Sequence, residues 1–479
     1  MNNYTLSLAV LSSLYLGGCA IGPDYARPEI IVPDTFSYND TNKTVTNTMD
    51  TQWWKQFNDP SLTQSIENAL SANYDIQASQ ASVDAILGKF DQAKSYLYPQ
   101  INASSSLDRK SVDNASTGGY QLREGITSTY AGSLSLASYE IDLFGKVRRA
   151  NEAARATLLS TQYASQTLKL SIVSNVAASY IKLSSIQGQI ALARENATVT
   201  QDIANLNEFK YKHGVIAESV LLQSLSEVES AKATLSQLEA TKIAEEATFN
   251  LLLGRNPSKV TVSALKTIAL PDVPAALPSD ILNKRPDIAS AEQNLIAANA
   301  QIGVARAAYF PSIKLTGMLG VQSMELSNFV SNPAKIWEIA PSVSIPIFSA
   351  GLIAGQIKTA EADRNQTLAV YKKTIVSAFN DTDNAIGQAS KAKEQITFQT
   401  ARAAAIQKAL MQSKLRYQVG TIAYSDMLLV QQQWLQASQQ LLIAKQNALI
   451  STIALYKALG GGWNQEQTPP LPNFLPAGR

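Results

Sequence analysis

Internal duplication is the feature that most constrains the fold of this chain. The block Tyr-x-x-Gly-x-Ile-Ala-x-Ser occurs twice, at residues 211–219 and 417–425. The stretches around these blocks, residues 161–254 and 367–460, align as two copies of one unit, and further matches lie upstream. A period of about two hundred residues is too long for a solenoid of small repeats. The sequence therefore predicts one architecture built from two related halves.

The N-terminus is typical of a lipoprotein. An apolar run over residues 4–16 is too short to span a membrane, and Gly17 and Gly18 then precede Cys19. We expect residues 1–18 to be a signal peptide and Cys19 to carry a diacylglycerol and an N-acyl chain. Each buried methylene would contribute about 0.8 kcal/mol to membrane attachment. The alternative is an incidental buried cysteine behind an ordinary signal peptide.

Composition argues against several classes of function. Charged residues are 16% of the chain, below the roughly 25% usual for soluble domains, which favours helices packed against one another. A net charge of +2 gives no basic footprint, so we expect no nucleic-acid partner. His213 is the one histidine, and the carboxylates form no spaced acid/base or metal-ligand motif. We predict that the chain is not an enzyme and has no metal and no cofactor beyond the lipid on Cys19.

Each half is expected to contain one β-hairpin and one long helical hairpin. Alternation of apolar and polar residues predicts the β-hairpins at about residues 100–141 and 312–347. Helical patterns of roughly 60 residues follow at 146–212 and 355–418, each near 90–100 Å long at about 1.5 Å per residue. An earlier helical pattern runs from residue 61 to about residue 98.

The repeated block is expected to form the turn of each helical hairpin. Gly214 and Gly420 suit the left-handed position just after a helix, and Ser219 and Ser425 suit the N-cap of the returning helix. The patterns divide the chain into a signal peptide (1–18), a lipidated N-terminal segment (19–60), a first repeat (61–254), a proline-rich connector (255–280), a second repeat (281–460) and a tail (461–479).

Four strands cannot close a membrane-spanning barrel by themselves, because about eight is the usual lower limit. An open sheet would leave the backbone groups of its edge strands unsatisfied in lipid. We therefore expect oligomerisation, with eight strands from two copies or twelve from three. A soluble sandwich anchored by the lipid alone, with the helices as a coiled-coil spacer, is the alternative.

Three motifs closely resemble those of the outer-membrane factor family, the TolC-like exit ducts of tripartite efflux systems, in its lipoprotein (NodT-type) branch. The motifs occupy residues 139–148, 277–288 and 305–313, and the resemblance covers essentially the whole mature chain. It implies a trimer with a twelve-stranded outer-membrane β-barrel, four strands per chain, continuous with a long periplasmic α-helical barrel. It also implies a Gram-negative outer membrane, a periplasmic adaptor (membrane fusion protein) and an inner-membrane transporter of the resistance-nodulation-division type.

The same resemblance implies two kinds of site. Asp426 matches the first of two acids at the periplasmic aperture, and Tyr417 matches an aromatic of the closing network. Leu429 stands at the position of the second acid, while Ile422 and Val220 stand where some members have a salt-bridging pair. We expect three copies of Asp426, backed by Leu428 and Leu429, to form the constriction. The expected adaptor contacts at the hairpin tips are Tyr211, Lys212, Gly214, Ile216, Gly420 and Ile422.

The predicted function is an outer-membrane exit duct that passively conducts drugs or other small toxic solutes. Two alternatives remain at this point: a TolC-like duct for type I protein secretion, and a non-conducting lipid-anchored scaffold. For Asp426, the alternative is a solvated acid near a helix N-terminus, where negative charge is favoured.

Overall fold

The computed structural model describes residues 20–38, 51–112, 116–117, 120–121, 125–272 and 278–463, so Cys19 and most of the expected tail lie outside it. The chain divides into two compact units, and each unit takes segments from both sequence repeats. The sheet unit comprises Met1–Glu29, Val83–Thr161 and Ala291–Tyr371. The hairpin unit comprises Ile30–Ser82, Gln162–Ser290 and Lys372–Arg479. The division in space therefore cuts across the duplication in sequence.

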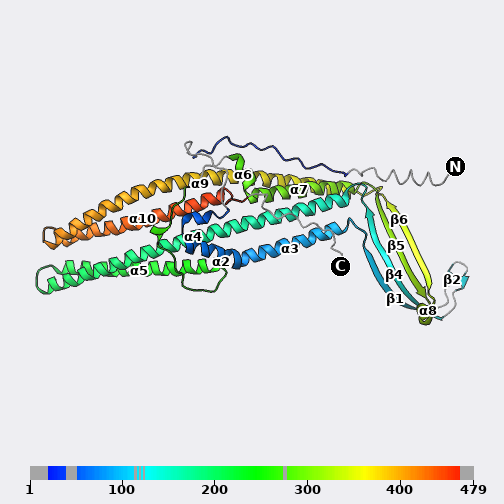
Figure 1. Cartoon of the computed structure of the whole chain (residues 1–479), viewed down its shortest axis with the longest axis horizontal. Helices are drawn as coiled ribbons and strands as arrows, with labels where there is room; N and C mark the ends of the chain where they lie inside the picture. Colours follow the sequence, from blue (N-terminus) through cyan, green and yellow to red (C-terminus); the bar gives the residue numbers. More distant parts are fainter. Residues whose placement is uncertain are drawn as a thin grey trace. The chain divides into compact units, whose positions relative to one another are not determined.

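The sheet unit contains both expected β-hairpins, joined into one antiparallel sheet (Figure 1). In the described residues the strand order is β1-β4-β5-β6, so the two halves of the chain meet at the pairing of β4 with β5. A small pair, β2 with β3, lies in the connection between β1 and β4. The bounds are β1 Ile101–Val112, β2 Ser116–Thr117, β3 Tyr120–Gln121, β4 Gly125–Ile141, β5 Ser312–Ser323 and β6 Ala334–Ser344.

One face of this sheet is apolar and the other polar, because side chains alternate along each strand. Leu134, Leu319 and Trp337 occupy one row of the apolar face, and all three are exposed in the single chain. The polar face carries the hydrogen bond between the hydroxyls of Ser104 and Ser133, at 3.0 Å. A bulge in β4 between residues 136 and 139 shifts the register by one residue, so Tyr139 and Ile141 lie on the apolar face, opposite Leu315 and Ile313.

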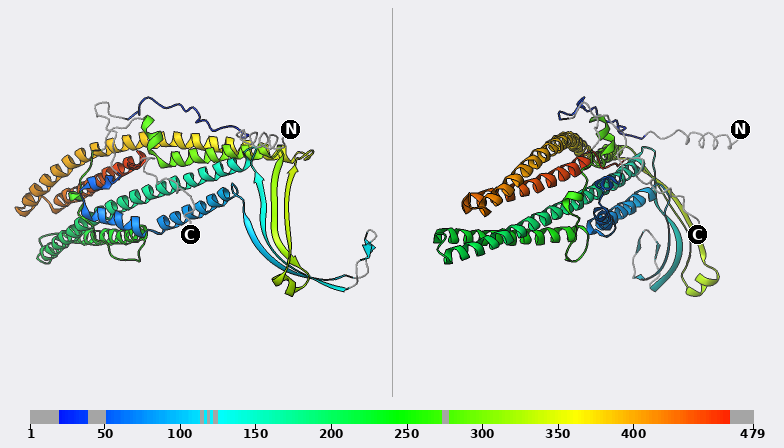
Figure 2. Two further views of the ribbon diagram at one scale, coloured as in Figure 1. Left: turned by 45° about the vertical axis from the view of Figure 1, so that its right-hand side comes forward. Right: turned by 60° about the vertical axis from the view of Figure 1, so that its left-hand side comes forward.

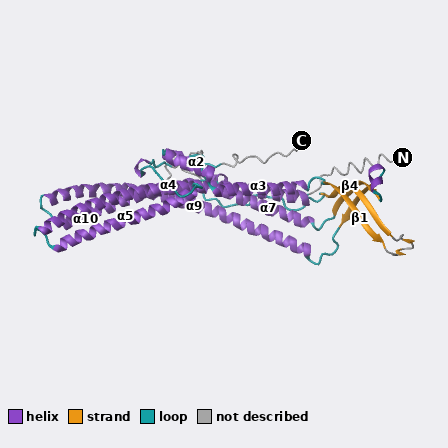
Figure 3. Ribbon diagram, turned by 90° about the horizontal axis from the view of Figure 1, so that it is seen from below, coloured by secondary structure: helices purple, strands orange, loops and turns teal. Residues whose placement is uncertain are grey.

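The helices of the two halves match in length. The long helices α4 (Lys146–Lys212) and α9 (Leu352–Gln418) each have 67 residues, and the returning helices α5 (Glu218–Leu252) and α10 (Tyr424–Ala458) each have 35. Figure 3 shows these helices in purple. The remaining helical elements are η1 Trp53–Phe57, α2 Pro60–Ala72, α3 Tyr74–Ser95, η2 Leu265–Thr267, α6 Pro278–Lys284, α7 Pro286–Ala307 and α8 Leu326–Ser331. Among the described residues, no helix combines the length and apolarity needed to cross a membrane.

The helical pattern from residue 61 to about 98 forms two helices, which corrects the expectation of one. Asn73 separates α2 from α3 with an extended backbone. Its side-chain carbonyl accepts the Ile76 backbone N–H at 3.0 Å, and its amide donates to the Leu252 carbonyl at 2.8 Å. The chain breaks here because Asn73 starts the second helix and ties it to the end of α5.

The four helix ends near the repeated glycines share one geometry. Gly214 has φ of 71° and Gly420 has φ of 75°, and a pair of backbone hydrogen bonds closes each end in the Schellman pattern. The same pattern ends α5 at Gly254 and α10 at Gly460. Glycine is favoured at all four positions because a Cβ disfavours positive φ.

The expectation that Ser219 and Ser425 are N-caps is wrong. The N-cap residues are Ala217 and Ala423, both extended and without a side-chain capping bond. Each serine therefore lies inside the first helical turn. Because the extended residue is the alanine, the new helix begins two residues earlier than a serine cap would require.

The hairpin unit has its main hydrophobic core where the N-terminal helices and the connector pack on the long helices. Trp53 stacks on Tyr456 with ring centroids 5.0 Å apart, and both are fully buried. The buried Asp59 carboxylate accepts hydrogen bonds from the Tyr180 hydroxyl at 3.0 Å and the Ser263 hydroxyl at 3.1 Å. Ser263 lies in the connector, so this buried network fixes the connector against α4.

In the sheet unit, the first described residues lie along the helices as a strap. Ile21 donates its backbone N–H to the Phe144 carbonyl at 3.0 Å, and Asp24 pairs with the buried Arg149 at 2.6 Å. Gly22 lies so close to Gly303 that a Cβ on Gly22 would be 2.5 Å from the Gly303 Cα. Figure 2 shows this N-terminal segment in dark blue.

Candidate functional site at the hairpin tips

The two helical hairpins end in tips that belong to the same unit. The first tip is residues 209–223, between α4 and α5, and the second tip is residues 415–429, between α9 and α10. Figures 1 and 3 show both as the turns at the free ends of the long helices. Their backbones follow the same course, since both begin with the glycine-ended helix described above.

Side chains from the two tips meet. The Lys210 ammonium donates to the Tyr417 hydroxyl at 3.0 Å and lies 4.8 Å from the centre of the Tyr417 ring. Tyr417 in turn contacts Tyr424, with ring centroids 5.9 Å apart. A cation over an aromatic face contributes about 0.5–1 kcal/mol at an exposed site. This contact therefore ties the end of α4 to the second tip.

An apolar cluster supports the contact from within. Tyr424, Met427 and Leu428 are its buried members, and we call them the tip cluster. Partly buried residues from both hairpins pack against the cluster: Ile203, Val220, Tyr417 and Ile422. The first turns of α10 therefore rest on α4 through apolar contacts as well as through Lys210.

Tyr424 is the least expected member of the site. Its hydroxyl is buried and has no hydrogen-bond partner among the described residues. Burial raises the pKa of Tyr424 to about 12, with smaller contributions from the charges of Glu227 and Tyr417. The tyrosine therefore stays neutral at physiological pH. Sequence reasoning missed it because the matching position in the first repeat is Glu218, which is exposed.

The predicted aperture residues do not share one environment. Asp426 is exposed in the first turn of α10, and Leu429 is exposed on the same helix. Leu428 is 4% exposed and belongs to the tip cluster, so in this chain it packs against α4 and does not present its side chain to solvent. The expectation that Leu428 backs Asp426 at a constriction stays a prediction.

The predicted adaptor contacts are mostly at the surface. Tyr211 and Lys212 are exposed, and Lys212 pairs with Glu208 at 2.7 Å. Gly214 and Gly420 are exposed, with free space where a Cβ would stand. Ile216 and Ile422 are partly buried, and Ile422 packs against the tip cluster. His213 is exposed, with its Nδ1 2.8 Å from the Phe209 carbonyl.

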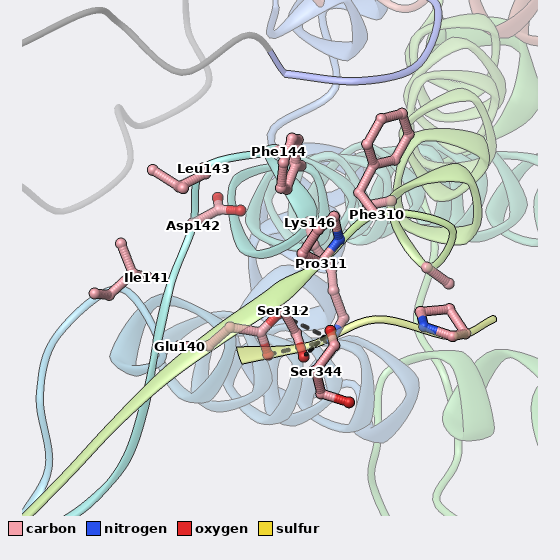
Figure 4. A pocket seen from close by; sticks show the side chains of 13 residues that line it. Glu140, Ile141, Asp142, Leu143, Phe144, Lys146, Phe310, Pro311, Ser312 and Ser344 are labelled. Atoms are coloured by element: carbon pink, nitrogen blue, oxygen red, sulfur yellow. Dashed lines mark hydrogen bonds and ion pairs between the residues drawn. The ribbon is translucent and has the colours of Figure 1, made fainter. Parts of the chain in front are cut away.

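A hollow lies in the sheet unit, where the strands meet the helices (Figure 4). It has a volume of about 270 Å³, and Lys146 pairs there with Glu140 at 3.1 Å. Phe144 and Phe310 pack with ring centroids 4.9 Å apart. Two of the three motifs quoted above, residues 139–148 and 305–313, meet at this hollow. Those motifs therefore build the junction between sheet and helices.

This combination defines a class: a sheet apolar on one face, joined in the same chain to paired helical hairpins, is the architecture of outer-membrane channels. A sequence profile for the family described as outer membrane efflux protein matches residues 65–255 and 277–461. The chain therefore belongs to the outer membrane efflux protein family.

Individual relatives align with this chain over nearly its whole length. A probable efflux pump outer membrane protein of Pseudomonas putida, TtgC, is 33% identical over 473 residues, which cover 97% of each chain. The cation efflux system protein CusC of Escherichia coli is 31% identical, over 95% of this chain and 98% of CusC. The crystal structure of the Campylobacter jejuni CmeC outer membrane channel superposes with a TM-score of 0.87 at 26% identity, covering 94% of this chain and 96% of CmeC.

These findings confirm the main expectations from the sequence. The fold is that of the trimeric TolC-like outer-membrane channels. The protein is an outer-membrane component of an efflux pump, as its relatives are, and the family consists of channel proteins and not of enzymes. The roles of individual residues at the tips stay predictions.

Proposed function

We propose that three copies of this chain close one twelve-stranded barrel and form the exit duct of a tripartite efflux pump. The observation that carries the proposal is the sheet itself. In the described chain, β1 and β6 are its two edges, and each has one side without a strand partner. In lipid each unpaired backbone group costs several kcal/mol. Pairing β6 of one copy with β1 of the next satisfies both edges and places the apolar face toward lipid.

The hairpin unit continues the duct on the periplasmic side in this proposal. The exposed tips would dock to a periplasmic adaptor, which connects the duct to an inner-membrane transporter of the resistance-nodulation-division type. Exposed apolar side chains at both tips support docking, because unpartnered apolar surface favours contact with another protein. Those side chains include Phe209, Val215, Leu415 and Val419.

The proposed cargo is small toxic solutes. Relatives are named for efflux of toluene, antibiotics and cations, and all cover nearly the whole chain. A strain lacking this protein should become more sensitive to members of one of these groups, and restoring the gene should reverse the change. The test is growth on a panel of organic solvents, antibiotics and silver or copper ions. Normal resistance together with loss of a secreted protein would instead favour type I secretion.

The duct is tested directly in planar bilayers. Purified protein should migrate as a trimer in mild detergent and give one conductance per trimer. A monomer with a complete pore of its own would contradict the shared barrel. A stable trimer without conductance would favour the lipid-anchored scaffold.

Asp426 is the proposed aperture acid. It is exposed in the first turn of α10 close to the tip cluster, so three copies can converge on the duct axis. A ring of carboxylates attracts cations and repels anions. In bilayers, Asp426→Asn should lower the cation-to-anion permeability ratio. Glu218→Gln is the matched control, because Glu218 is an exposed acid in the first turn of α5. Equal effects of both variants would remove Asp426 from the aperture.

Lipidation of Cys19 is proposed from the sequence, with a diacylglycerol and an N-acyl chain on the processed N-terminus. Mass spectrometry of the purified protein should show both additions on a peptide that begins at Cys19. In Cys19→Ser the additions should be absent. An unmodified Cys19 in the mature protein would contradict this proposal.

A further inference from the structure

The connection between β5 and β6 folds back onto the sheet as the short helix α8. Phe329 of α8 fills the space above Gly132 of β4, where a Cβ would be 3.3 Å from the Phe329 Cζ and 3.9 Å from a Val321 methyl. Gly132 and Val321 are directly paired and lie on the apolar face, in register with Leu134 and Leu319. The helix therefore sits on the apolar face and not on the polar face that would line a duct.

The strand pairing shows where α8 lies along the length of the sheet. Val321 pairs with Lys335, and the next apolar row, Leu319 with Trp337, follows directly. Lys335 and Trp337 are exposed. Lysine and tryptophan side by side are typical of the boundary between lipid headgroups and acyl chains. Phe329 thus packs at this boundary, at the end of β5 far from α7.

Helix α8 and the turn before it expose three apolar side chains in the single chain, interspersed with the exposed polar residues Glu325, Ser327, Asn328 and Ser331. Met324, Leu326 and Val330 are 70%, 59% and 81% exposed. The polar side chains are satisfied locally, since Asn328 donates to Glu325 at 2.9 Å and Ser331 to the Ser327 carbonyl at 2.8 Å. Such a segment can lie at the headgroup level, with the Glu325 carboxylate in water and the apolar side chains toward the acyl region.

The length of the apolar band leaves room for this helix. The apolar row positions of β5 run from Ile313 to Val321. At about 3.4 Å per residue this stretch is roughly 27 Å along the strand, and a tilt of about 40° reduces it to roughly 20 Å across the bilayer. Outer-membrane barrels present an apolar band about 25 Å tall. The exposed apolar side chains of α8 extend this band beyond Val321.

We propose that α8 is an interfacial membrane helix whose Met324, Leu326 and Val330 contact the acyl chains of outer-leaflet lipid. The apolar side chains of α8 adjoin the apolar face of the sheet at the level marked by Lys335 and Trp337, which is why lipid is the occupant. The inference rests on the membrane placement of the sheet proposed above. The inference places the connection between β5 and β6 at the membrane surface. This connection is therefore not a lid over the duct.

The test uses an environment-sensitive fluorophore on Val330→Cys, in full-length protein reconstituted into lipid vesicles; the native Cys19 thiol would be acylated. Two matched labels accompany it. Ile339→Cys lies on the apolar face of β6, and Ser106→Cys is exposed on the polar face of β1. The label at position 330 should emit at a shorter wavelength than the label at 106 and be quenched by nitroxide lipids, most strongly by those with the nitroxide close to the headgroup, whereas the label at 339 should be quenched most by nitroxides deeper in the acyl chain. The label at 106 should be quenched by aqueous iodide.

The outcomes separate the two proposals. If the label at 339 responds to lipid while the label at 330 responds to iodide, α8 faces water and the inference is wrong. If the label at 339 also responds to iodide alone, the membrane placement of the sheet fails, and the inference fails with it.

Discussion

The first and second tips have the same backbone conformation, but side chains at matching repeat positions differ in burial. Leu428 in the second tip is 4% exposed, whereas the residue at the same repeat position in the first tip, Leu222, is 57% exposed. Three residues further on, the buried Gln431 corresponds to the exposed Leu225. Backbone geometry was thus duplicated with the sequence, but packing was not. The tip cluster of α10 packs against Ile203 of α4 and Val220 of α5 in the neighbouring hairpin.

The difference also shows where a single chain is incomplete. Leu222 and Leu225 leave an apolar strip on α5 that nothing in the described chain covers. In the proposed trimer this strip is available to the next copy. The second tip anchors the two hairpins of one chain to each other, and the first tip offers surface to other chains.

The largest effect is expected from truncating the buried Leu428, which tests whether the two tips differ in packing. Leu428→Ala should lower the free energy of local opening of the second tip by about 2–5 kcal/mol, because it leaves a cavity beside Met427. Leu222→Ala should change it by less than about 0.5 kcal/mol, as usual for a surface position. Hydrogen exchange of the first turns of α10 measures both. Equal protection in the two variants would show that the tip cluster is not a packed core.

Alkaline pH should expose the buried tyrosine of the second tip. The pKa of Tyr424 is raised to about 12 because burial disfavours its charged form. From about pH 10 the unfolded chain loses a proton that the folded chain retains, so stability falls up to pH 12 and then levels off. The contribution of Tyr424 to this loss is about 2 kcal/mol.

The matched variant is Tyr424→Phe. It removes a hydroxyl that has no partner in the described chain, so stability near pH 8 should stay the same or rise slightly. Between pH 10 and 12 its melting temperature, followed by circular dichroism, should fall less than that of the unaltered protein. Parallel curves would mean that Tyr424 is accessible to water at the tip.

Replacing the glycine should cost the same stability at both tips, because the two turns have the same backbone conformation. Gly214→Ala and Gly420→Ala each place a Cβ at positive φ, and neither Cβ meets a neighbour within 4 Å. The cost is therefore one of backbone conformation alone, about 1–2 kcal/mol at each site. Hydrogen exchange at the two turns should report equal losses. A much larger loss at residue 420 would mean that the glycine itself takes part in packing between the hairpins.

The smallest expected effect is at the polar contact. Lys210→Gln removes the ammonium from the Tyr417 hydroxyl and ring, which should cost about 0.5–1 kcal/mol. Arg416 occupies the same position in the second repeat and is exposed, so Arg416→Gln serves as the control and should cost almost nothing. Hydrogen exchange of the second tip measures both. A greater effect of the Arg416 change would reverse the assignment of the cross-tip contact.

The sequence indicated the turn at each tip because the turn depends on local backbone preference. Gly214 and Gly420 were placed correctly, since a left-handed residue after a helix strongly favours glycine. The caps at Ser219 and Ser425 were not, because a serine in the first turn and a serine at the cap differ by a shift of two residues. Nor did periodicity reveal the break at Asn73, whose capping bond depends on contact with Leu252.

The candidate site was less accessible to sequence reasoning. Asp426 and the tip surface were found through resemblance, and their exposure agrees with those roles without testing them. Lys210, Tyr424 and Met427 were not assigned to the site. Nothing along the chain distinguishes Leu428 from Leu222, because both stand at the same position of a duplicated unit. The distinction exists only where α10 meets α4.

What the sequence by itself determined is the set of elements and their repetition: strands that alternate, helices of equal length in both halves, and glycines that end them. These follow from periodicity and local conformational preference, which each short segment carries with it. The tertiary structure alone decided that β4 of one half pairs with β5 of the other, that α8 lies on the apolar face, and that one tip of the two is buried against its neighbour. Those outcomes depend on which distant surfaces exclude water together, and no segment encodes this alone.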